Sequence, residues 1–137
     1  MDSMMKCYFD LFTTDVERIV FRKRILHSIA DVEEKWRIGQ RIAQEEILHS
    51  KKEDWLLSIQ GLSTYLSGKY GETYSSEKLN LYYLFYLGHL NLFDSLFYSR
   101  NRILDWSDYV KLLGIKNEGA RKKMEEKMLS SMSLVQT

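Results

Sequence analysis

The side chains best suited to metal binding or covalent catalysis are few and widely spaced. The three histidines, His27, His49 and His89, are 22 and 40 residues apart, so no two of them stand four residues apart as in the helical metal-site pattern. A zinc site needs several such ligands close together. The single cysteine, Cys7, lies among apolar residues, and no nucleophile signature surrounds it. We therefore predict no catalytic residue, no metal site and no cofactor.

A basic segment, Arg22-Lys23-Arg24-Ile25-Leu26-His27, combines a permanent cation with a titratable imidazole. Arginine can stabilise developing negative charge, and histidine can transfer a proton near neutral pH. The segment resembles the short motif of the helical HEPN ribonucleases, in which an Arg and a His on one helix face approach an RNA phosphate. Lys23 departs from the uncharged or acidic residue usual after the Arg. The resemblance implies RNA cleavage by Arg22 and His27; the alternative is a solvated basic helix face.

A second basic segment, residues 109–124 with the sequence YVKLLGIKNEGARKKM, resembles a helix-turn-helix unit. Gly114 would form the turn, and Arg121 with the lysines after it would meet phosphates from a helix in the major groove. Glu125 and Glu126 follow at once, and 20 basic against 19 acidic residues leave a net charge of +1. Phosphate attraction dominates the affinity of DNA-binding proteins, so we do not expect nucleic acid as a partner.

The stretch from Leu79 to Tyr98 is the most apolar part of the chain. Polar residues interrupt it, so it lacks the roughly 18 nearly uninterrupted apolar residues of a membrane span. Its length favours a central helix packed on all sides, although its alternation also permits a strand. An aromatic core can hold an apolar ligand such as a fatty acid. The residues predicted to line such a site are Tyr82, Phe85, Tyr86, His89, Phe93 and Phe97.

A methionine stripe runs along the last predicted helix, residues 117–132. Met124, Met128 and Met132 recur at steps of four and so share one helix face. Unbranched methionine side chains adapt well to a partner surface. We predict an interface with another protein or a second copy of the chain; the alternative is a peripheral part of the core, since every surface helix has one apolar face.

Helical periodicity places further helices around the central one. A capping box at Thr14 separates a first helix over 3–12 from a second, and apolar residues recur every three or four positions over 32–47 and 55–66. Gly68 is expected to end the last of these helices.

The remaining predicted helix boundaries follow in the second half of the chain. Ser75 or Ser76 can cap the central helix, and Asp105 begins a helix that Gly114 ends. The chain contains no proline to interrupt a helix. We predict an all-α fold with one compact domain over 1–137. It is expected to be a bundle of five to seven helices around a central helix at about 79–98, and globin-like packing is one form that such a bundle can take. The tail is expected to fray from about residue 133.

The composition, 45% apolar and 28% charged residues, is ordinary for a globular domain. A lone thiol and the absence of a secretory signal in the first residues favour the cytoplasm. Without a catalytic constellation, we predict a small non-enzymatic regulatory or inhibitory protein that acts by protein–protein interaction and can form a homodimer. The alternative is a helical sensor domain for an apolar ligand, with the ribonuclease and DNA-binding interpretations behind it.

Overall fold

The computed structural model of the protein describes residues 3–25, 30–93 and 103–135. These residues form six α-helices and one 3-10 helix, without a strand, which confirms the predicted all-α bundle. The elements are α1 Ser3–Ile25, α2 Ala30–Leu48, α3 Lys52–Tyr70, η1 Glu72–Tyr74, α4 Ser76–Gly88, α5 Trp106–Leu113 and α6 Glu118–Val135.

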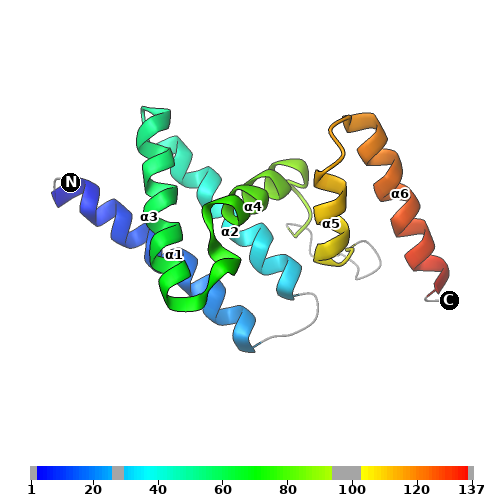
Figure 1. Ribbon diagram of the computed structural model, residues 1–137, viewed down its shortest axis with the longest axis horizontal. Helices are drawn as coiled ribbons and strands as arrows, with labels where there is room; N and C mark the ends of the chain where they lie inside the picture. The colour runs from blue at the N-terminus through cyan, green and yellow to red at the C-terminus, as the bar shows by residue number, and fades with distance from the viewer. Residues whose placement is uncertain (1–2, 26–29, 94–102, 136–137) are drawn as a thin grey trace.

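Helices α2 and α4 form the centre of the bundle (Figure 1). Ile42 of α2 lies in one hydrophobic cluster with Leu79 of α4, and Trp36 of α2 lies in another with Phe85 of α4. Later residues of one helix therefore meet earlier residues of the other, and the pair is antiparallel. Figure 1 shows α1 and α3 at one end of this pair and α5 with α6 at the other.

The two ends of the central pair carry separate hydrophobic clusters. The first joins α1, α2, α3, η1 and α4 and includes the buried side chains of Phe12, Trp55 and Leu62. The second joins the start of α2 to α4 and α5, and α6 reaches it with the partly buried Met128 and Leu129. Helix α6 is consequently the outermost element, held mainly through α5 (Figure 1).

Two predicted helix boundaries in the first half are wrong. Helix α1 passes through Thr14, the predicted cap, since neither Gly nor Pro interrupts it. Helix α3 passes through Gly68 and ends at Tyr70, where Gly71 has a φ of 101°. That left-handed conformation is readily available to glycine, so Gly71 terminates α3 in place of Gly68.

The central helix is shorter than predicted. The side chain of Ser75 caps α4 by accepting the N–H of Lys78 at 3.3 Å, as expected for Ser75 or Ser76. Helix α4 ends at Gly88, and residues 89–93 form turns instead of continuing the helix toward Tyr98. Residues 94–102 and 136–137 lie outside the described residues. Helix α6 continues to Val135, so the prediction that the tail frays from about residue 133 is wrong for residues 133–135. None of the described helices combines the length and apolarity needed to cross a membrane.

Candidate functional site: a groove between α2, α3 and α4

Three helices enclose an open, mostly apolar groove with a volume of about 480 Å³. We call it the α2–α3–α4 groove. Each helix contributes residues three or four positions apart, which lie on one helix face. The lining residues are Ile42 and Glu46 of α2; Lys52, Trp55, Leu56, Ile59 and Gln60 of α3; and Ser76, Leu79, Asn80 and Tyr83 of α4.

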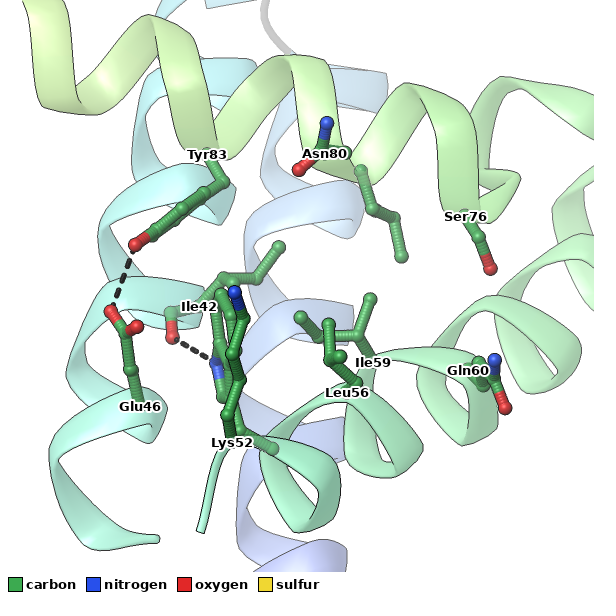
Figure 2. Close-up of a pocket in the computed structure, with 11 residues that line it drawn as sticks. Ile42, Glu46, Lys52, Leu56, Ile59, Gln60, Ser76, Asn80 and Tyr83 are labelled. Atoms are coloured by element: carbon green, nitrogen blue, oxygen red, sulfur yellow. Dashed lines mark hydrogen bonds between the residues drawn. The ribbon is translucent and has the colours of Figure 1, made fainter. Parts of the chain in front are cut away.

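The floor of the groove belongs to the first hydrophobic cluster. Ile42, Trp55 and Leu79 are buried there. The indole N–H of Trp55 donates to the carbonyl oxygen of Ile42 at 3.1 Å, and the Trp55 ring meets the Tyr83 ring edge-on at 5.2 Å between centroids. These contacts connect all three helices, so the floor is fixed by core packing. Leu56 and Ile59 project from α3 into the space above it (Figure 2).

Polar groups are placed differently at the two ends of the groove. At one end the Tyr83 hydroxyl donates to the Glu46 carboxylate at 2.8 Å. Burial, followed by this hydrogen bond, raises the pKa of Tyr83 to about 12. Neutral Gln60 and Ser76 occupy the other end (Figure 2).

Lys52 is the one cationic residue among the groove-lining side chains. It rises from the start of α3 toward α4 (Figure 2) and is exposed. Within the described part of the chain its ammonium group forms no ion pair and no hydrogen bond. A cation at a helix N-terminus opposes the helix dipole, an effect of about 0.3–1 kcal/mol. Local helix energetics therefore do not explain a lysine at this position.

Large apolar side chains remain exposed along the helices of the groove. Leu56 is 43% exposed, and Leu84 and Leu87, which share the α4 face of Asn80 and Tyr83, are 42% and 44% exposed. The predicted burial of the central helix on all sides is thus wrong. At the α2–α3 corner, the exposed side chains are Ile47, Leu48 and Leu57. Clustered exposed apolar residues beside a concavity are typical of interaction sites.

None of the described aromatic residues that were predicted to line a ligand site lines the α2–α3–α4 groove. Tyr82, Phe85 and Phe93 are buried, whereas Tyr86 and His89 are partly exposed. Their rings pack edge-on or tilted against Trp36, Trp106 and Tyr109, with centroids 4.6–5.5 Å apart. Phe97 lies outside the described residues. A ligand among these rings remains a prediction.

His89 joins α4 to the outermost helix. Its Nδ1 lies 3.1 Å from the carbonyl oxygen of Phe85, and its Nε2 lies 2.5 Å from the Glu125 carboxylate. Both neighbours can accept a hydrogen bond from the imidazole ring. His89 thereby holds α6 in place, a structural role that the sequence did not indicate.

The residues of the predicted methionine interface differ in their surroundings. Met128 packs against the second hydrophobic cluster, whereas Met124 is 39% exposed. The side chain of Met132 lies outside the described residues. A partner on this face is still a prediction, and Met124 is the described residue on which it now depends.

The segment 109–124 does form two helices joined by a short turn, α5 and α6. Arg121, expected to meet phosphate, donates instead to the carbonyl oxygen of Ile115 at 3.0 Å. This bond ties the Arg121 side chain to the turn, while Lys122 and Lys123 are exposed. DNA binding by this unit is not tested by these contacts.

The remaining candidates do not assemble into a described site. His27 and the side chains of Arg22 and Cys7 lie outside the described residues. His49 lies beside the buried Glu45, with Nε2 at 3.6 Å from a carboxylate oxygen. No cluster of three metal-ligating side chains occurs among the residues that the structure describes.

The chain has no significant match among protein-family models, curated proteins or solved structures. The α2–α3–α4 groove is therefore the feature from which a function can be inferred.

Proposed function

We propose that the protein is a small non-enzymatic regulatory or inhibitory protein that acts by contact, and that the α2–α3–α4 groove receives the apolar face of a helix from a partner protein. The supporting observation is a groove with a buried apolar floor and exposed leucines on the helices that form it. Amphipathic helices bind such grooves through apolar anchors on successive turns.

The shape and chemistry of the groove agree with this mode of binding. The buried floor of Ile42, Trp55 and Leu79 provides a preformed surface, which reduces the ordering cost of association. Leu56 and Leu84 offer further apolar area that a partner would remove from water. Each Å² of such area contributes about 25 cal/mol before the costs of association are subtracted.

A pair of matched variants tests the proposal in a pull-down from cells that express the protein. Leu56→Glu places a charge in the groove, whereas Leu11→Glu makes the same change at an exposed leucine of α1 outside it. Both side chains are about half exposed, so both variants are expected to fold, which circular dichroism verifies. We expect a partner retained by the wild type and Leu11→Glu but lost by Leu56→Glu. Equal retention by both variants contradicts the proposal.

A second candidate function is a sensor for an apolar small ligand in the same groove. Its volume of about 480 Å³ falls within the roughly 300–1,000 Å³ of ligand pockets. Native mass spectrometry of the purified protein, alone and with added dodecanoate, tests this candidate. A bound mass that disappears in Leu56→Glu would favour the sensor; unmodified protein at every dodecanoate concentration would exclude this ligand.

A further inference from the structure

We infer that the helix bound in the α2–α3–α4 groove carries an acidic residue that pairs with Lys52. This inference rests on the proposed function and specifies the chemistry of the partner. It distinguishes an acidic amphipathic helix from a neutral or basic one.

The charge complementarity comes from the position of Lys52. Its ammonium group is exposed, lies along the wall of an apolar groove, and pairs with nothing in the described part of the chain (Figure 2). An apolar partner helix that covers the groove would remove water from this ammonium group. A desolvated charge is costly unless a counter-charge accompanies it. A partner carboxylate supplies that counter-charge.

The acidic side chain of the groove does not provide an equivalent attraction for a basic partner. The Glu46 carboxylate already accepts the Tyr83 hydroxyl at 2.8 Å. The positive end of the α3 dipole lies beside Lys52 and adds attraction for an anion. The two charges therefore differ in availability, and Lys52 is the charge left for a partner to pair with.

Selection from a defined peptide library tests the inference even though the partner is unidentified. The library displays amphipathic helices with leucine fixed on successive turns of one face and all other positions random. It is selected in parallel on the wild type, on Lys52→Glu and on Lys51→Glu. Lys51 is the exposed neighbour that does not line the groove, so its variant changes the net charge equally and serves as the control.

We expect one peptide position to be enriched in Asp or Glu on the wild type and on Lys51→Glu, and in Lys or Arg on Lys52→Glu. Replacing that acid by its amide should weaken binding to the wild type roughly tenfold, a typical effect for a partly desolvated charge pair, and should change binding to Lys52→Glu little. If peptides are enriched but the preferred charge does not change from acidic to basic on Lys52→Glu, the inferred pairing with Lys52 is wrong, whereas the proposed groove remains supported. If no peptide is enriched on any of the three proteins, the groove proposal itself fails, and the inference fails with it.

Discussion

Gly39 of α2 and the backbone of Tyr82 in α4 are in such close contact that no other residue fits at position 39. A Cβ atom built there would lie 2.1 Å from the Tyr82 carbonyl oxygen and 2.9 Å from the Cβ of Tyr86. Because α2 and α4 are the central pair, this contact sets their spacing. It also fixes the relative positions of Ile42 and Tyr83, which both line the groove.

Gly39→Ala is expected to destabilise the protein although alanine has the higher helix propensity. The added methyl group must push α2 away from α4, and overpacking of this kind costs typically 1–3 kcal/mol and sometimes more. Gly68→Ala is the matched control, since Gly68 lies within α3 and a Cβ there meets nothing within 4 Å. The control should stabilise by roughly 0.5–1 kcal/mol. Urea unfolding measures the change in the free energy of unfolding for both variants. Equal changes for Gly39→Ala and Gly68→Ala would contradict the packing described for α2 and α4.

The buried Glu45 carboxylate depends on Arg41. The Arg41 guanidinium donates to Asp15 at 2.8 Å and to Glu45 at 3.0 Å, and Glu45 is 1% exposed. Arg41→Met leaves a buried charge without its main partner and should reduce the free energy of unfolding by about 3–5 kcal/mol. The double variant Arg41→Met/Glu45→Met should recover much of the loss.

The control for this prediction is the exposed pair of Lys122 and Glu118, 3.6 Å apart. Lys122→Met should change the free energy of unfolding by about 0.5 kcal/mol or less, as for other exposed ion pairs. Chemical denaturation at low salt measures the free energy of unfolding of the wild type and of these three variants. An Arg41→Met protein as stable as the wild type would disprove the role of Arg41.

Alkaline pH should destabilise the protein through its buried tyrosines. Burial raises the pKa of Tyr109 to about 12, whereas an unfolded tyrosine has a pKa of about 10. Between these values the unfolded chain loses the proton first, so stability falls as pH rises from about 10 to 12. Each such group contributes at most about 1.4 kcal/mol per pH unit. Tyr109→Phe should make this fall shallower.

The same substitution also removes a hydrogen-bond acceptor. The Tyr109 hydroxyl accepts the N–H of Leu104 at 3.2 Å, so Tyr109→Phe should cost about 1–3 kcal/mol at neutral pH. Thermal unfolding followed from pH 7 to 12 separates this constant loss from the change in slope. Parallel profiles for wild type and variant would show that the Tyr109 hydroxyl does not titrate as stated.

The two described methionines of α6 should respond differently to substitution. Met128 packs against the second hydrophobic cluster, so Met128→Ser should reduce the free energy of unfolding by about 1–2 kcal/mol. Met124 is more exposed, so Met124→Ser should leave stability nearly unchanged and weaken any self-association. Calorimetry and light scattering measure the two effects. A wild type that is monomeric at high concentration would exclude a homodimer through this face.

Helix positions follow from the sequence where one apolar face repeats over several turns. The periodicity of residues 32–47 and 55–66 marks α2 and α3 because an apolar residue recurs on almost every turn. Helix α2 buries more than this stripe, since Ile38, Ile42 and Glu45 are buried as well, whereas Ile47 at its end is 84% exposed. The predicted cap at Thr14 is wrong since the residues after it favour helix as much as those before. Such a local signal cannot end a helix that tertiary contacts at Phe12 and Val16 continue to bury.

The groove could not be predicted, because it exists only where three helices are placed around one space. One signal was available in the sequence of α3. Leu56 and Leu57 make its apolar surface wider than the stripe of Trp55 and Ile59, and this surface is wider than packing against one neighbouring helix requires. The excess of aromatic residues in α4 indicated the core correctly. It could not reveal that another face of α4, with Leu84 and Leu87, is exposed.

The most direct test of the proposed docking site is a methyl NMR titration of the labelled protein with a peptide enriched by the library selection. We predict saturable shifts at Ile42, Leu56, Ile59 and Leu79, with little change at Leu112 of the second hydrophobic cluster. Saturable shifts centred on α5 and α6, with the groove methyl groups unmoved, would contradict the account.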